Sequence, residues 1–225
     1  ADVSLRRGAG ILNISGQQVT ADWPRMFRDA LNFSLPSCNL DIRWGQGWQL
    51  GFNDCRLEND DLALRGNVRI KKDDGKPDVD VNVALSRGKI DRLDPYWPEA
   101  ILKDGVKNWL RNSLLGGELV SGRFQIYGDL DDWPFRNGAG RFDARAEIVN
   151  GHLEYYEGWP HARDFTASVL FSGPSMAAKG RIGDIGGVAV HSVDAFIPDL
   201  KTAVLTVDYE ADGDLPGVLG FLEQT

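Results

Sequence analysis

Apolar and polar residues alternate over most of this sequence, and this period of two limits the chain to a fold built mainly from β-strands. In the stretch 79–85 every odd position is valine or leucine, and the positions between them include Asp80 and Asn82. Similar alternation recurs in residues 62–70, 120–126, 142–148, 165–171 and 205–209. Turn sequences such as Asn150-Gly151 separate these stretches. We therefore predict roughly a dozen strands, each with one apolar face, joined mostly by short turns into an antiparallel meander.

A single amphipathic helix interrupts the strands, at about 98–115. Apolar residues in this stretch recur every three or four positions and include Trp109, whereas Lys107 falls on the opposite side. Pro98 suits a first helical turn, and Gly116-Gly117 predicts the end of the helix. We expect the apolar stripe, Trp109 included, to pack on the sheet and Lys107 to face solvent.

The predicted strands present more apolar surface than one helix can cover. A helix of about 18 residues is about 27 Å long, whereas a dozen strands at about 4.8 Å each span about 58 Å. The sheet can fold over as a sandwich, close into a barrel, or curl into a half-pipe that holds an apolar ligand. The alternation alone does not choose between a β-sandwich and a long curved trough.

The charge and hydropathy of the chain exclude two classes of protein. The 225 residues carry a formal net charge of -8, whereas binding to nucleic acid requires a basic surface. A mean hydropathy of -0.30 and 26% charged residues do not fit a membrane-embedded body. The first residues already alternate like a strand and the last stop without a tail. We therefore expect a fragment of a longer protein.

The two cysteines fall in a hairpin whose register can be worked out from the sequence. Pairing Trp44 with Trp48 across a three-residue turn puts the apolar residues of both strands on one face. Farther along, the apolar phase shifts by one residue, and a bulge at Asn53-Asp54 explains the shift and places Cys55 opposite Cys38. A disulfide between them would indicate an oxidising compartment. Two buried free thiols are the alternative.

No motif predicts catalysis, a metal site or a cofactor. The three histidines, His152, His161 and His191, lack the spacing of a metal site. Three aromatic residues near two glutamates resemble a sugar-stacking site. The aromatic residues are Tyr155, Tyr156 and Trp159, and the glutamates are Glu154 and Glu157. Most carboxylates, however, occupy turns or the polar phase of strands, which is typical of solvated surface. We expect no enzyme, and keep a carbohydrate-active enzyme on a β-sandwich as an alternative.

An ordered set of short motifs resembles the central region of the YhdP family, which belongs to the AsmA-like, TamB-related proteins of Gram-negative envelopes. The motifs are Tyr96-Trp97-Pro98, Trp109-Leu110, Gly117, Gly122, Gly128-Asp129-Leu130, Trp133-Pro134-Phe135, Gly140-Arg141-Phe142 and Gly158-Trp159-Pro160. The resemblance is clearest from about Val79 to Leu222. It implies a bridge-like lipid-transfer protein, anchored in the inner membrane and extending through the periplasm.

The resemblance also implies that the functional surface is a β-groove, apolar inside and polar outside, along which phospholipids move toward the outer membrane. The alternation then assigns the groove lining to one apolar phase. The predicted lining residues are Val81, Val83, Val120, Phe124, Ile126, Phe142, Ile148, Val169 and Phe171. The implied partners are phospholipid acyl chains and other segments of the same protein.

We expect residues 1–225 to form one groove segment, with strands in 1–90, the helix region in 91–117 and strands in 118–225. One alternative is a structural or protein-binding module of the envelope, in which the same β fold has a filled core.

Overall fold

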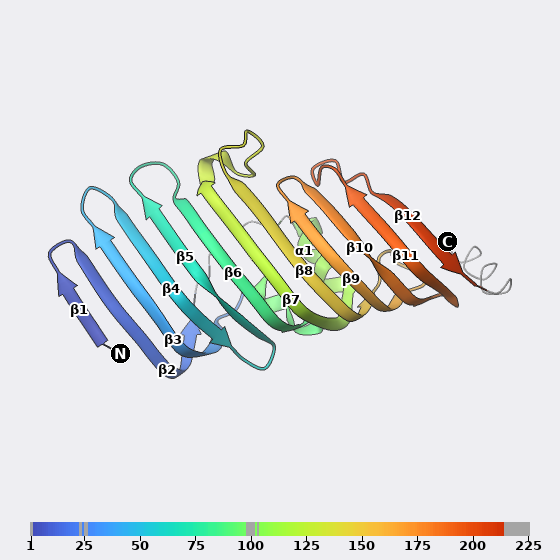
Figure 1. The fold of residues 1–225 in the computed structure, drawn as a ribbon, viewed down its shortest axis with the longest axis horizontal. Helices are drawn as coiled ribbons and strands as arrows, with labels where there is room; N and C mark the ends of the chain where they lie inside the picture. The colour runs from blue at the N-terminus through green and yellow to red at the C-terminus, as the bar shows by residue number, and fades with distance from the viewer. Residues whose placement is uncertain (1, 23, 25–26, 98–101, 103, 214–225) are drawn as a thin grey trace.

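The computed structural model describes residues 2–22, 24, 27–97, 102 and 104–213, which form one antiparallel sheet of twelve strands. Every strand pairs with its neighbours in sequence, so the sheet runs in order from β1 to β12 (Figure 1). The strands are β1 (Asp2–Arg6), β2 (Ala9–Ala21), β3 (Leu31–Trp44), β4 (Trp48–Glu58), β5 (Leu62–Lys72), β6 (Asp78–Lys89), β7 (Leu114–Asp129), β8 (Arg141–Leu153), β9 (Ala162–Ser172), β10 (Ser175–Ile185), β11 (Val188–Ile197) and β12 (Thr206–Asp212). The predicted antiparallel meander is confirmed.

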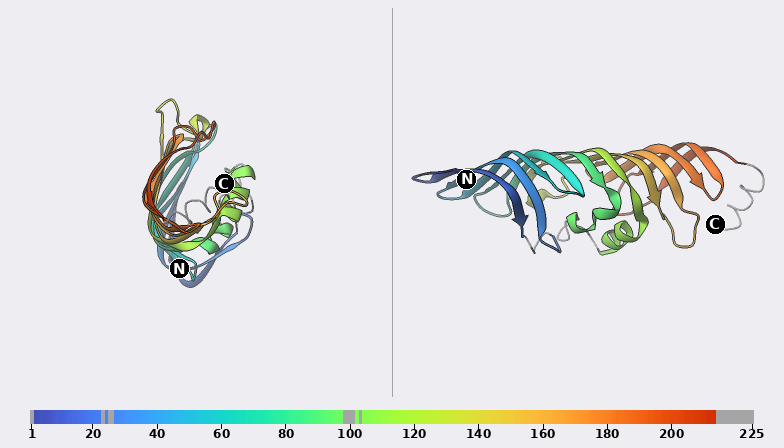
Figure 2. Two further views of the ribbon diagram at one scale, coloured as in Figure 1. Left: turned by 90° about the vertical axis from the view of Figure 1, so that its right-hand side faces the viewer. Right: turned by 90° about the horizontal axis from the view of Figure 1, so that it is seen from below.

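The sheet curls about its long axis into an open trough, as Figure 2 shows in end view. Among the described residues β1 pairs only with β2 and β12 only with β11, so the sheet does not close into a barrel. The same residues form no second sheet, which a sandwich requires. The trough is therefore confirmed and the β-sandwich is wrong.

The trough has two long edges of different construction. The connections from β1 to β2, β3 to β4, β5 to β6, β7 to β8, β9 to β10 and β11 to β12 lie along one edge, at the top of Figure 1, which we call the hairpin edge. The opposite edge, called the helix edge, carries the long connection from β6 to β7. That connection contains two short 3-10 helices, η1 (Ile90–Arg92) and η2 (Asp94–Tyr96), and the helix α1 (Asp104–Ser113). A third short helix, η3 (Leu130–Asp132), follows β7 at the hairpin edge.

The helix ends earlier than predicted. The predicted start at Pro98 lies outside the described residues, α1 ends at Ser113, and Gly116-Gly117 lies inside β7. The reason is a tertiary contact: the Ser113 carbonyl accepts a hydrogen bond from the Glu154 backbone N–H at 2.9 Å, and the strand pairing with β8 begins at the next residue. Gly117 therefore serves close strand packing, since a Cβ there would lie 2.8 Å from the Cα of Gly151.

The helix also presents a different face from the one predicted. Trp109 is 46% exposed and Val106 is 45% exposed, whereas Ser113 is buried. The Lys107 side chain retains only 17% of its accessible surface and pairs with Asp104 at 2.9 Å. The cause is the placement of α1, which lies at the mouth of the trough beside the helix edge and not flat on the sheet (Figure 2). The prediction that Trp109 packs on the sheet is wrong.

The cysteine hairpin has the register expected from the sequence. Trp44 faces Trp48, and the register shifts by one residue beyond the pair Asn39 and Asn53. Asp54 has a positive φ of 50°, as the predicted bulge requires. Cys38 and Cys55 are joined by a disulfide and packed against apolar neighbours on β2 and β4.

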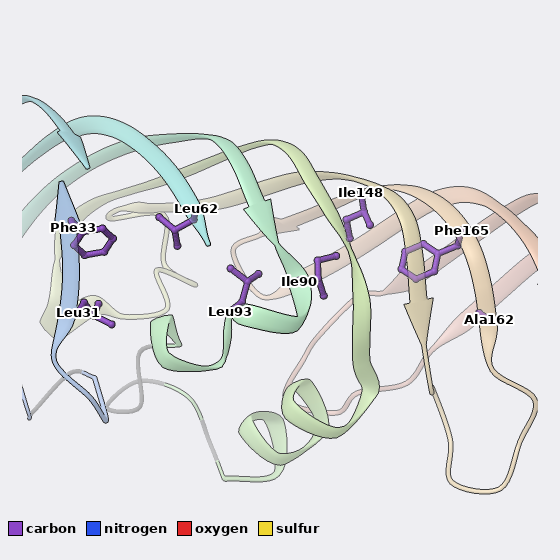
Figure 3. Packing of buried hydrophobic residues seen from close by; sticks show 8 residues of the cluster. All are labelled: Leu31, Phe33, Leu62, Ile90, Leu93, Ile148, Ala162 and Phe165. Carbon is purple, nitrogen blue, oxygen red and sulfur yellow. The ribbon is translucent and has the colours of Figure 1, made fainter. Parts of the chain in front are cut away.

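The largest hydrophobic cluster lies at the helix edge. Figure 3 shows its buried members, which come from four strands, from η1 and from the residue after it. They are Leu31, Phe33, Leu62, Ile90, Leu93, Ile148, Ala162 and Phe165. This rim cluster fixes the connection from β6 to β7 against the inner side of the sheet.

Candidate binding groove

The inner face of the trough is a continuous apolar surface formed by strand register. Residues directly opposite one another in an antiparallel pair point to the same face. One row of such residues crosses β2 to β8 and consists of Leu12, Leu40, Phe52, Val68, Val81, Ile126 and Phe142. A second row crosses β6 to β11 and consists of Val83, Phe124, Ala144, Phe171, Met176 and Ile197. Every member of both rows is apolar.

The concave side is identified by the rim cluster. Ile148 belongs to that cluster and has the same phase on β8 as Phe142 and Ala144, because the pairing of β8 is regular over these residues. The two rows therefore lie on the side of the sheet that carries η1 and α1, which Figure 2 shows to be the concave side.

Eight of the nine residues predicted to line the groove lie on this inner face. The eight are Val81, Val83, Phe124, Ile126, Phe142, Ile148, Val169 and Phe171. Ile148 is packed in the rim cluster, whereas the other seven are half-buried. Among the described residues no large side chain is less than 2% exposed. The inner face away from the rim cluster is thus not covered by another layer of protein.

The ninth predicted residue, Val120, is displaced by a bulge. The register between β7 and β8 shifts between Leu119 and Ser121, so Leu119, not Val120, faces Ile148. Leu119 also packs against the rim cluster, and Val120 is 45% exposed. Counting alternate residues from Phe124 down the strand could not find Leu119, because one inserted residue reverses the phase.

Aromatic side chains gather where the inner face meets the hairpin edge. Trp44 and Trp48 face each other there, and they are 49% and 39% exposed. Farther along the same edge, the Trp133 ring lies 5.2 Å from that of Phe142, which faces the groove. The sequence marks these residues as tryptophans near strand ends, and the observed pairing of Trp44 with Trp48 and the ring contact of Trp133 place them at the inner face.

The outer face carries the charges. Gln125 pairs with Asn82 and Asp143 on this side of the sheet. Exposed ion pairs join neighbouring strands, such as Arg69 to Asp80 at 3.3 Å and Lys179 to Asp194 at 2.7 Å. Each pair adds little to stability in water, but together they keep the outer face soluble while the inner face stays apolar.

A charged clasp holds the helix edge in place. Asp94 in η2 accepts hydrogen bonds from Arg28 at 2.9 Å and from Arg111 of α1 at 2.8 Å. Partial burial raises the pKa of Asp94, but the hydrogen bonds from the two arginines outweigh it and leave the pKa below its usual value. The clasp ties the connection before β3, η2 and α1 together.

Two of the three histidines and the aromatic residues near Glu154 meet at the connection from β8 to β9, where the His161 Nε2 atom lies 3.7 Å from a Glu154 carboxylate oxygen. His152 and His161 share a hydrogen bond of 2.9 Å between ring nitrogens, and burial lowers the pKa of His152. In the described part of the chain no three metal-ligating side chains gather. Tyr155 packs against the rim cluster, and its ring lies 5.8 Å from that of Trp159.

Comparison with known proteins places these features in a family. The family described as YhdP protein matches residues 1–225. The chain is 20% identical over 220 residues to the intermembrane phospholipid transporter YhdP of Escherichia coli (strain K12), covering 96% of this chain and 17% of that protein. No solved structure matches. None of the helices in the described residues is long and apolar enough to cross a membrane.

Proposed function

Because this chain belongs to the YhdP family, we propose that its groove is one segment of a conduit that carries phospholipid between the inner and outer membranes. The observation that carries the proposal is the continuous, half-buried apolar inner face, whose rows extend from β2 to β11 without a covering layer. Acyl chains would lie on these rows, and head groups would remain in water at the open mouth.

The physical basis of binding is burial of apolar surface, at about 25 cal/mol per Å². Neighbouring strands present similar apolar side chains along each row. A lipid that moves from one strand to the next therefore exchanges one apolar contact for another. A uniform surface of this kind favours sliding over tight binding at one place. No bond is made or broken, and the chain acts as a passive conduit with no catalytic residue.

The location we propose is the periplasm, with the intact protein anchored in the inner membrane. The Cys38–Cys55 disulfide supports this location, because such bonds persist in oxidising compartments. Residues 1–225 would form one groove segment. The outer edges of β1 and β12, which pair with no further strand among the described residues, would continue into other segments of the same protein.

A photo-crosslinking amino acid tests the path of the lipid. Introduced in the intact protein at Phe124 or Ile126, on the inner face, it should capture phospholipid. Introduced at Gln125, on the outer face of the same strand, it should not. Capture at 125 alone would show that the lipid uses the other face. Absence of capture at all three positions would favour the rival function, a protein-binding module.

Charge substitutions test transport at the same positions. A carboxylate on the inner face must lose water when acyl chains arrive, at a cost of several kcal/mol without a partner. Phe124→Asp or Ile126→Asp should therefore block lipid passage and leave a folded protein, because the half-open groove lets the carboxylate reach water. Gln125→Asp should have no effect. If Phe124→Asp unfolds the protein, the inner face is a filled core.

A further inference from the structure

One lysine carries a charge at the margin of the inner face. Lys72 is the last residue of β5, and it pairs directly with Trp48, which pairs in turn with Trp44. Lys72 therefore continues the inner phase of Val68 and Ile70 to the hairpin edge. At the paired positions of β3 to β12 that the structure describes, the rest of this phase carries no charge and is apolar or glycine, apart from the hydroxyl group of Tyr209.

The surroundings leave the Lys72 charge available to a ligand. Its neighbour Lys71 points to the outer face and forms an ion pair with Asp73, which raises the pKa of Lys71. Lys72 is exposed and forms no ion pair with a described carboxylate. Two further cations of this corner, Arg6 and Arg43, lie on the outer side of the same edge and likewise have no ion-pair partner in the described part of the chain. Asp73 and Asp74 follow Lys72 in the same turn, and Asp73 is already engaged by Lys71.

Farther along the hairpin edge, arginine side chains are paired with carboxylates. Between the loops after β7 and after β11, Arg136 donates two hydrogen bonds to Asp199, at 2.7 and 2.8 Å. These bonds, with one from the Lys201 backbone N–H, lower the pKa of Asp199 to about 2. Arg141 is likewise paired with Asp143. Among the described cations of the hairpin edge, those without an ion pair are therefore concentrated over β1 to β5, and Lys201 after β11 is an exception.

The two tryptophans give this corner the character of a membrane interface. The Trp44 ring lies over the inner side of Gly10, where a Cβ would come within 3.6 Å of it. Below the tryptophans, toward the helix edge, the next row of the inner face is Ile42, Leu50, Ile70 and Val79. Indole rings and a lysine above an apolar surface are the groups that meet lipid head groups at the edge of a bilayer.

We propose that Trp44, Trp48 and Lys72 form a head-group station, at which the ammonium of Lys72 binds the phosphate of a phospholipid whose acyl chains lie on the rows below. This proposal rests on the conduit function and adds a fixed position and orientation: the phosphate sits at the hairpin edge, and the acyl chains point toward the helix edge.

The test compares two lipids with identical fluorescent acyl chains, phosphatidylglycerol and diacylglycerol, binding to the intact protein. Lys72→Gln should weaken binding of phosphatidylglycerol about threefold to fivefold, the upper range for an exposed ion pair, and leave binding of diacylglycerol unchanged. Lys72→Arg should retain the wild-type affinity. Lys71→Gln, one residue away on the outer face, is the matched control and should bind both lipids normally. Added salt should remove the difference between the wild type and Lys72→Gln.

Three results would overturn the station and leave the conduit intact: equal effects of Lys71→Gln and Lys72→Gln, loss of both lipids in Lys72→Gln, or no effect of Lys72→Gln. Binding of inorganic phosphate alone that depends on Lys72 would show a free-phosphate site and also refute the assignment. If the wild type binds neither lipid, the conduit function fails and the station fails with it.

Discussion

Two phenylalanines on the inner face give a direct measure of how far the trough is filled. Phe165 on β9 is 7% exposed and belongs to the rim cluster. Phe124 on β7 is half-buried, and its only described ring partner is Phe142, at 5.8 Å. Truncation of each to alanine removes the same atoms from the same face of the sheet, so the two variants differ only in what surrounds the ring.

Phe165→Ala should lower the free energy of unfolding by about 3–5 kcal/mol, because a buried ring loses its transfer free energy and leaves a cavity. The Phe165 ring lies directly on the backbone of Gly151, and β8 cannot move into the vacated space without breaking its pairing. Phe124→Ala should cost only about 1–2 kcal/mol, since part of the ring is already in solvent and no closed cavity forms.

Urea unfolding of the purified chain, followed by circular dichroism, measures both values. The midpoint should shift strongly for Phe165→Ala and weakly for Phe124→Ala, with the slope of the transition unchanged. Equal losses of about 3 kcal/mol or more in both variants would refute the reasoning. They would mean that the inner face near Phe124 is packed like the rim cluster, and the open groove would be wrong.

Three further predictions concern the helix edge and the disulfide. Asp94→Asn should destabilise the chain by about 1 kcal/mol at pH 7. Because the pKa of Asp94 is lowered in the folded state, the wild type should lose this advantage as the pH falls below about 4. A stability difference between the wild type and Asp94→Asn that persists at pH 2 would contradict the clasp. Trp109→Ala should cost less than about 1 kcal/mol, since 46% of the residue is exposed; a loss as large as that of Phe165→Ala would place Trp109 in a core. Thiol titration of the denatured, unreduced chain should find no free cysteine. Reduction of the disulfide should lower the free energy of unfolding by about 3 kcal/mol, because the bond closes a loop of 17 residues. Two free thiols in the unreduced protein would exclude the disulfide.

The period of two in the sequence was sufficient to predict the strands and which side of the sheet most apolar residues occupy. The reason is that a residue on a strand can face only two sides, so an apolar residue such as Phe124 or Phe142 also fixes the sides of its neighbours. The hairpin at Trp44 and Trp48 could be predicted in register as well, because a short turn leaves the two strands one way to align their apolar residues.

The sequence could not predict what depends on contacts between distant residues. The end of α1 is set by Glu154, which is 41 positions from Ser113, and local glycines indicated the wrong boundary. The exposed face of α1 depends on where the helix lies relative to the trough. Val120 was misplaced by one inserted residue. Lys72 lies two residues after Ile70 and so falls on the same side of β5 as the apolar residues. Only its pairing with Trp48 shows that this side is the inner face at the hairpin edge.

The irregularities of the sheet explain how a trough can stay open. The register shifts occur in the halves of the strands toward the helix edge, for example beyond Phe52 on β4, after Ile148 on β8 and after Gly180 on β10. Asp54, Asn150 and Asp164, close to such shifts, have positive φ angles of 50–52°. Bulges bend strands and increase their twist, so the backbone itself turns the sheet inward at the helix edge. The rim cluster then needs to fill only that bent margin, while the regular halves keep unbroken apolar rows up to the hairpin edge. Curvature held by the backbone requires no second layer to support it, and the inner face therefore stays available for a ligand.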